Sequence, residues 1–368
     1  MIGTEFLDGQ GLGNQLFCYI TARCIAADRG CEFGTANQEQ LAVNIHSGRG
    51  MYFMDMDLGA RIEYADPSAP RNAGRSEMPV LKAPDGAVMT PYREKELRFY
   101  QGSSAHDLSN GCYVAGEDSS LHELPDNTLL YGNLQDERYF ASHREEIREW
   151  LRVKPEYDSH EFTRDNLCIL NLRGGEYTGH PELYLRRRYW LDAMRNMRKI
   201  RPDMEFIVST DDPEAAGKLL PGLPVYHRGL DQDYTILKNA RYLILSNSSF
   251  AFFPAYTSDT LQYAIAPKYW ARHNVSDGYW ASEQNIYNIF HYQDRRGRLF
   301  TAEECRAELE EYKRTSKRYA KAGERPQGVG AKIAGLSCKM RMTVYYAQRA
   351  WYSLRRRAGY IVPYAKKG

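Results

Sequence analysis

The chain has 368 residues, 43% hydrophobic and 26% charged, so it can bury a large core, and this composition excludes a disordered tail or a disulfide-stapled miniprotein. Its 49 basic and 47 acidic residues leave a net charge of only +2. The overall charge therefore gives no reason to expect a nucleic-acid-binding protein. Seven dispersed cysteines without a C-x-x-C pair are typical of a reduced, cytoplasmic protein without a structural zinc site. The length predicts two domains. We expect neither a secretory signal nor a transmembrane helix, because no basic and then apolar leader and no long apolar run occurs.

A glycine-rich turn comes before the first predicted helix, at residues 14–28. Gly9, Gly11 and Gly13 follow a short predicted strand at 3–7, and glycines there let backbone N–H groups approach an anion at the helix start. This strand, turn and helix pattern is typical of Rossmann-like units. Asn14 stands where the dinucleotide fingerprint has its third glycine, so the match to an NAD-dependent enzyme is incomplete.

Residues 43–126 show only short strand-like pieces between loops, and the sequence does not predict their fold. Within them Asp55 and Asp57 form a D-x-D pair, a spacing by which some glycosyltransferases hold a divalent metal. Because apolar residues alternate with these acids, the pattern favours a half-exposed strand over a metal site. A strand is then predicted at 128–131, a helix at 135–151 and a linker at 155–165.

Strands and helices alternate after this linker. Strands are predicted at 167–172, 205–209, 223–227, 242–245 and 262–266, and helices at 189–197, 213–219, 236–240 and directly after Asn247. This alternation predicts a parallel, doubly wound sheet, which binds ligands at the carboxyl ends of its strands.

Three polar segments follow predicted strands of this sheet. NLRGGEY at 171–177 offers Arg173, which can hold a diphosphate through two hydrogen bonds; a surface turn with an ion pair is the alternative. STDD at 209–212 is also compatible with an ordinary helix N-cap. SNSSF at 246–250 places hydroxyls at a helix start, where backbone N–H groups favour phosphate.

The C-terminal part differs in composition from the rest. A charged helix is predicted at 301–322, a linker at 323–330, and a helical tail at 331–368 with nine basic residues, six aromatic residues and no acidic one. Such a tail can lie on an anionic membrane surface or fold back on the acidic body of the protein, and RNA binding is the least favoured of the three interpretations.

Seven segments, in this order, resemble those of glycosyltransferase family 11, the bacterial alpha-1,2-fucosyltransferases. GLGNQLFCY at 11–19 is similar to the family's G-L-G-N-Q-x-F-x-Y, NLRGGEY to its H-x-R-R-G-D-Y, STDD to its S-D-D, and NSSF at 247–250 to its N-S-S-F. YREKE at 92–96, GNLQDERYF at 132–140 and IAPKYW at 265–270 resemble further family segments. The resemblance covers roughly residues 5–272 and does not reach the tail.

The resemblance implies a GT-B architecture, with two Rossmann-like α/β domains facing a cleft and a helical basic extension behind them. We expect an acceptor-side domain at 1–155, a nucleotide-sugar domain at 156–300 and the extension at 301–368. The implied reaction is an inverting, metal-independent transfer of L-fucose from GDP-fucose to a sugar hydroxyl, in alpha-1,2 linkage. The implied acceptor is a surface glycan, which can be lipid-linked, and the expected location is the cytoplasm, peripherally at the inner membrane face.

The matched motifs also imply the site residues. Arg173 and Glu176 are the expected catalytic residues, Arg173 stabilising the departing diphosphate and Glu176 serving as the general base. The expected donor-binding residues are Gly11, Gly13, Asn14, Asn171, Asp211, Asp212, Asn247, Ser248, Ser249 and Phe250.

Three positions depart from the family pattern and keep alternatives open. Asn171, Gly174 and Glu176 stand where the family has His, Arg and Asp, so a different GDP-sugar is an alternative donor. The remaining alternatives are a Rossmann-type NAD-dependent enzyme, a non-catalytic glycan- or nucleotide-binding module, and a metal-dependent transferase that uses the D-x-D pair.

Overall fold

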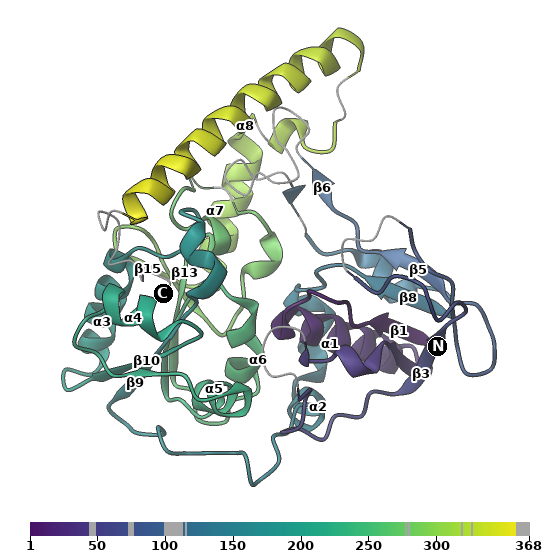
Figure 1. Ribbon diagram of the computed structural model, residues 1–368, viewed down its shortest axis with the longest axis horizontal. Coiled ribbons are helices and arrows are strands. Elements are labelled where there is room, and N and C mark those ends of the chain that lie inside the picture. The colour runs from purple at the N-terminus through teal and green to yellow at the C-terminus, as the bar shows by residue number, and fades with distance from the viewer. Residues whose placement is uncertain are drawn as a thin grey trace.

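The computed structural model describes residues 1–43, 49–72, 77–98, 113–114, 116–276, 278, 280–317, 319–324 and 327–357. Two mostly parallel sheets lie side by side, each flanked by helices, with the N-terminal part of the chain forming one and residues 167–300 the other (Figure 1). The predicted α/β class is therefore confirmed, and parallel strand pairs account for both sheet interiors.

The first sheet has the strand order β4-β3-β2-β1-β8-β5, and β4 pairs antiparallel with β3 at its edge. Helix α1 (Leu12–Asp28) connects β1 to β2, and almost all of its side chains up to Ala26 are buried. The strands are β1 (Ile2–Glu5), β2 (Phe33–Ala36), β3 (Ala60–Tyr64), β4 (Leu81–Lys82), β5 (Thr90–Arg93) and β8 (Thr128–Tyr131). Strands β6 (Leu97–Arg98) and β7 (Tyr113–Val114) pair antiparallel in a separate two-stranded sheet. The turns η1 (Gln38–Gln40) and η3 (Ser119–Glu123) are 3-10 helices.

The predicted helix at 135–151 is wrong over its first half. Two 3-10 turns, η4 (Glu137–Tyr139) and η5 (Ala141–His143), precede a short α2 (Arg144–Trp150). Asp136 accepts a hydrogen bond from the backbone N–H of Arg138 (3.0 Å) and pairs with its guanidinium, and such local bonds compete with a helical backbone. Phe140, Ile147 and Leu151 are nevertheless buried, as the pattern predicted.

The second sheet has the order β11-β10-β9-β12-β13-β14-β15, with β15 antiparallel at one edge. Its interior strand β9 (Leu167–Leu172), between β10 and β12, is buried along its whole length, as parallel strands covered on both faces are. The other strands are β10 (Glu205–Thr210), β11 (Val225–Tyr226), β12 (Tyr242–Leu245), β13 (Tyr263–Pro267), β14 (His291–Gln293) and β15 (Leu299–Phe300). The helices are α3 (Arg187–Ile200), α4 (Pro213–Leu219), α5 (Leu230–Lys238) and α6 (Phe252–Tyr256), with 3-10 turns η6 (Gly175–Gly179), η7 (Ser249–Ala251), η8 (Trp270–Arg272) and η9 (Glu283–Asn285).

Most of the strands and helices predicted for this second half are confirmed, but two of the helices differ from the prediction. Helix α4 and strands β9 and β12 have the predicted bounds, whereas α5 begins at Leu230 instead of residue 236. The helix predicted after Asn247 is instead a 3-10 turn followed by the five residues of α6.

One aromatic cluster joins the two sheets. The ring centroid of Phe17, on α1, lies 4.8 Å from those of both Phe252 and Phe253, and Phe140 and Tyr287 lie within 6.1 Å of Phe17. All five side chains are buried. The two halves therefore share one core, and the predicted domain boundaries at 155 and 300 stay predictions.

Two helices form the C-terminal part. Helix α7 (Ala302–Thr315) begins with a capping box, because the side chains of Thr301 and Glu304 each accept a hydrogen bond from the backbone of the other residue. After η10 (Tyr319–Lys321), α8 (Gly328–Arg357) runs for 30 residues along one side of the molecule (Figure 1). The predicted linker at 323–330 thus ends earlier than expected, and residues 358–368 of the predicted tail lie outside the described residues. Among the described helices, none combines the length and apolar character needed to cross a bilayer.

Candidate functional site

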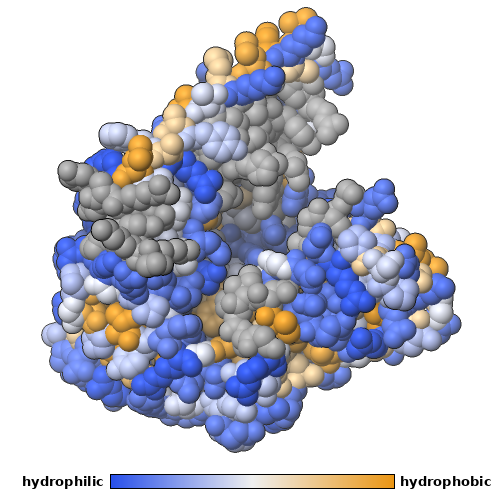
Figure 2. Space-filling view, in the orientation of Figure 1, coloured by the Kyte–Doolittle hydropathy of each residue, from blue (hydrophilic) through white to orange (hydrophobic). Residues whose placement is uncertain are grey.

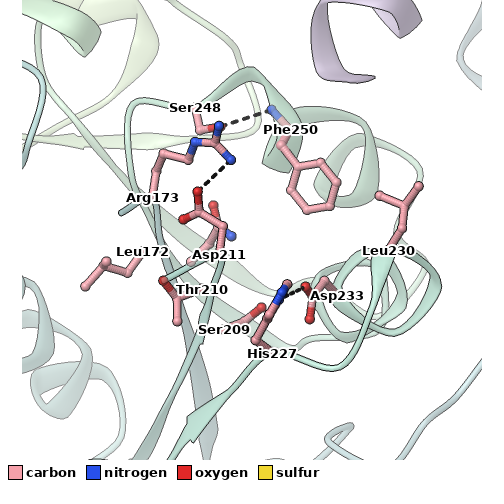
Figure 3. A pocket seen from close by; sticks show the side chains of 11 residues that line it. Leu172, Arg173, Ser209, Thr210, Asp211, His227, Leu230, Asp233, Ser248 and Phe250 are labelled. Carbon is pink, nitrogen blue, oxygen red and sulfur yellow. Dashed lines mark hydrogen bonds and ion pairs between the residues drawn. The ribbon is translucent and has the colours of Figure 1, made fainter. Parts of the chain in front are cut away.

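A pocket opens at the carboxyl edge of the second sheet, where β9, β10 and β12 end (Figure 3). Parallel sheets present their ligand sites at this edge, because the strand ends and the following turns converge there. The empty space in the pocket, open solvent at its mouth included, is about 480 Å³. Its lining residues are Asn171, Leu172, Arg173, Ser209, Thr210, Asp211, His227, Leu230, Asp233, Ser248 and Phe250.

Arg173 lies at one end of this pocket, directly after β9. Its guanidinium is 2.8 Å from a carboxylate oxygen of Asp211 and 3.1 Å from one of Glu176, and its side chain is only 15% exposed. Burial opposes the charge, but the two carboxylates outweigh burial and raise the pKa of Arg173 above its ordinary value. Arg173 is therefore a fixed, permanently charged cation whose remaining N–H groups can bind an anion.

Glu176 differs from Arg173 in its environment. Its side chain is 63% exposed, lies on η6, and does not belong to the pocket lining found among the described residues. Because an exposed carboxylate costs little to move, an anion at Arg173 can displace it. The structure thus places the two expected catalytic residues in direct contact.

The glycines after Arg173 permit close approach of the neighbouring strand end. A Cβ at Gly174 would lie 2.4 Å from Cβ of Asp212, and Gly175 has a φ of +42°. The Gly174 N–H donates to Asp211 (2.7 Å), which fixes the carboxylate that pairs with Arg173. The family's second arginine is therefore incompatible with this packing, because any side chain at 174 would collide with Asp212.

The two adjacent aspartates have different roles. Asp211 lines the pocket, whereas Asp212 accepts a hydrogen bond from the Ala215 N–H (3.0 Å) and caps α4. The N-cap interpretation therefore holds for Asp212. The expected contact of Asp212 with the donor stays a prediction, because Asp212 is not among the lining residues of the pocket.

The segment 247–250 also contains both pocket-lining residues and residues with structural contacts. Ser248 and Phe250 line the pocket, and Ser248 Oγ accepts the Phe250 N–H at 3.4 Å. Asn247 is buried and donates to the carbonyl oxygen of Leu183 (3.1 Å). The backbone of Ser249 faces the N-terminal half of the chain, where a Cβ at Gly13 would lie 2.4 Å from its carbonyl carbon.

The remaining N-terminal candidates lie at the junction of the two halves. Gly11 has open space where a side chain would be. Asn14 accepts a hydrogen bond from the Gln135 side chain (3.0 Å), and Gln135 in turn accepts one from Asn285 (2.8 Å). These contacts hold the halves together, and the expected contacts of Gly11, Gly13 and Asn14 with a donor stay predictions.

Asn171 and two polar residues that the sequence did not single out also line the pocket. Asn171 is buried, and its side-chain oxygen accepts the Ser246 hydroxyl at 3.5 Å. At the other end of the pocket, His227 Nδ1 lies 2.8 Å from a carboxylate oxygen of Asp233 (Figure 3). Burial raises the pKa of Asp233, although His227 lowers it. The sequence could have indicated that His227 lies in the pocket, because His227 is the last residue of the predicted strand that became β11 and the strands of a parallel sheet end at the same edge.

The D-x-D pair lies elsewhere, and its predicted strand is wrong. Met54 forms a single bridge to Val153, and residues 55–59 belong to no strand. Asp55 pairs with Lys154 (3.0 Å) and Asp57 with Arg23 (3.2 Å), both carboxylates being highly exposed. Within the described ranges, no group of three or more His, Cys, Asp or Glu side chains is arranged to hold a metal ion.

Comparison with known proteins gives one significant curated relative. No family model matches the chain. An Escherichia coli alpha-1,2-colitosyltransferase is 28% identical over 160 residues, which are 38% of this chain and 54% of that protein. The chain is thus a distant homologue of that transferase and spans about half its length. A crystal structure of NodZ alpha-1,6-fucosyltransferase soaked with GDP-fucose matches this chain with a TM-score of 0.37 and 10% sequence identity. The match covers 70% of this chain and 92% of the NodZ chain. This likeness is too weak to define fold or function.

Proposed function

We propose that this protein is a GT-B type glycosyltransferase that moves L-fucose from GDP-fucose to a sugar hydroxyl, in alpha-1,2 linkage and with inversion. The observation that carries the proposal is Arg173, a partly buried cation at the carboxyl end of an interior strand of a mostly parallel sheet, in a pocket with polar groups from neighbouring strand ends. The matched motifs and the distant homology to a sugar transferase support it. The acceptor that we propose is a surface glycan, assembled in the cytoplasm.

In the proposed reaction, Arg173 binds the diphosphate of the donor. Asp211 binds one side of the guanidinium and is itself held in place by the Gly174 N–H. The diphosphate therefore displaces the other partner of Arg173, the exposed carboxylate of Glu176. As the acceptor oxygen attacks the anomeric carbon, the bond from that carbon to the diphosphate oxygen breaks, and Arg173 stabilises the charge left on GDP. Glu176, released from Arg173, accepts the proton of the acceptor hydroxyl.

We assign the nucleoside to the opposite end of the pocket. Phe250 and Leu230 supply an apolar surface for a planar base, while Asp233 and His227 supply hydrogen-bonding groups. This assignment replaces the expected nucleoside contact of Asp211, because Asp211 is engaged at the Arg173 end.

Colitosyl transfer is the second candidate. It is favoured by the name of the Escherichia coli relative and by Gly174, which removes a cation that the fucosyltransferase motif carries. The NAD-dependent and metal-dependent alternatives receive less support. Gly11 and Gly13 do not line the pocket among the described residues, and Asp55 and Asp57 pair with surface cations.

The test is a transfer assay with GDP-fucose and the GDP conjugate of colitose over a panel of galactosides. Mass spectrometry identifies the product, and the anomeric proton coupling reports inversion. We expect transfer by the wild type and loss of transfer in Arg173→Ala. The matched control Arg152→Ala should transfer like the wild type, because its guanidinium is exposed and remote in sequence from the pocket. Equal transfer by Arg173→Ala would contradict the assigned site, and absence of transfer from every GDP-sugar would contradict the function.

A further inference from the structure

An exposed apolar stripe runs along α8, the long C-terminal helix. Six of its members are 55% to 65% exposed, namely Ile333, Leu336, Met340, Val344, Trp351 and Leu354. Their spacing of three, four or seven residues places them on one helical face, within an arc of about 80° at about 100° per residue. The orange residues along the outer edge of α8 in Figure 2 show this face turned away from the body of the protein.

The opposite face of α8 is the one that contacts the body. Arg349 lies 3.1 Å from His180 Nε2, in the segment between the pocket and α3. On the helix, Arg349 is about 180° from the middle of the stripe. This contact therefore fixes the orientation of α8, so that the stripe faces outward.

Basic side chains flank the stripe on both sides. Lys332 and Lys339 are exposed along one border and Arg355 along the other. The sequence from residue 325 to the C-terminus contains no Asp or Glu. An apolar stripe with basic borders and an exposed Trp351 is the pattern of a helix that lies in the interface of an anionic bilayer.

We infer that α8 docks this protein on an anionic phospholipid surface, with the stripe in the headgroup layer and the basic borders against lipid phosphates. Charge complementarity favours lipid over a second copy of the chain. Two facing α8 stripes would bring the lysines and Arg355 of both copies together without an acidic partner, whereas paired helices need opposite charges beside their apolar seam. The inference does not depend on the proposed sugar transfer, because it rests only on α8.

Vesicle sedimentation with the full-length protein tests the inference. We expect binding to vesicles of phosphatidylcholine with phosphatidylglycerol, little binding to phosphatidylcholine alone, and weakening by salt. Lys332→Gln with Lys339→Gln should weaken binding about 30-fold, and Leu336→Ser with Met340→Ser should abolish it. The matched control is Val80→Ser with Val88→Ser, which removes two exposed apolar side chains far from α8 in sequence and should bind like the wild type.

Three results would overturn the inference. The first is equal binding to both kinds of vesicle, and the second is binding that Leu336→Ser with Met340→Ser leaves unchanged. The third is a dimer in light scattering that the same double change dissociates, which would assign the stripe to a second copy. GDP binding, measured on each variant, should match the wild type, so that failure here is distinguishable from failure of the proposed function.

Discussion

Gly13→Ala gives the sharpest test of how the two halves meet. Gly13 is the second residue of α1, and a Cβ there would lie 2.4 Å from the Ser249 carbonyl carbon and 2.6 Å from the Phe250 nitrogen. Carbon atoms in contact are about 3.5–4.0 Å apart, so the added methyl overlaps backbone atoms by more than about 1 Å. Backbone cannot rotate away as a side chain does, so the halves must separate slightly.

The expected cost is about 1–3 kcal/mol of unfolding free energy, the usual range for overpacking. The sign is informative, because alanine in place of glycine within a helix otherwise stabilises by about 0.5–1 kcal/mol. The shift also displaces Phe250 at the pocket, so GDP affinity should fall with stability.

Urea unfolding measures the first effect and calorimetry with GDP the second. Gly11→Ala is the matched control, because no atom lies within 4 Å of its added Cβ and its φ of −68° suits alanine. Its stability should stay within about 1 kcal/mol of the wild type. A Gly13→Ala protein as stable as the wild type would refute the close contact between α1 and the Ser249 backbone.

Three further predictions concern charge. Arg173→Ala should weaken GDP binding about 10- to 150-fold in calorimetry, equivalent to about 1.5–3 kcal/mol for a charge-assisted contact, and unchanged affinity would remove Arg173 from the site. Glu176→Gln should tighten GDP binding, because a competing carboxylate is lost, and should lower transfer in the assay; weaker GDP binding would contradict the proposed exchange of partners. Burial lowers the pKa of His273 to about 4, below the ordinary 6.5, so the unfolded chain binds a proton that the folded one does not, and stability falls as pH drops from 6.5 towards 4. Between pH 7 and pH 5, the unfolding free energy measured with urea should fall by about 2 kcal/mol less in His273→Asn than in the wild type. An equal fall in the two proteins would contradict the assignment of this pH dependence to His273.

Local sequence predicted the second sheet well because its signals are local. The apolar run of β9 and the Pro213 start of α4 need only their own neighbours, and both have their predicted bounds. The same logic identified Arg173 and Ser248, since each follows a strand whose end is visible in the pattern.

Contacts between distant parts of the chain could not be predicted in this way. Buried Glu94 accepts hydrogen bonds from the Leu134 N–H (2.8 Å), the Tyr139 hydroxyl (3.0 Å) and the Gln284 amide, which joins three separate segments. Such contacts depend on how the halves pack, which no local pattern encodes. Asp212 shows the converse limit, because a capping aspartate and a ligand-binding aspartate look alike until the fold places them.

Thermal unfolding with GDP, UDP, CMP and NADH, each with EDTA or with Mn²⁺, tests the central claim most directly. A ligand at about 100 times its dissociation constant adds about 2.7 kcal/mol of stability, which raises the midpoint measurably. The account predicts a rise with GDP that is the same in EDTA and in Mn²⁺. A rise with UDP that requires Mn²⁺, or a rise with NADH and none with GDP, would contradict it.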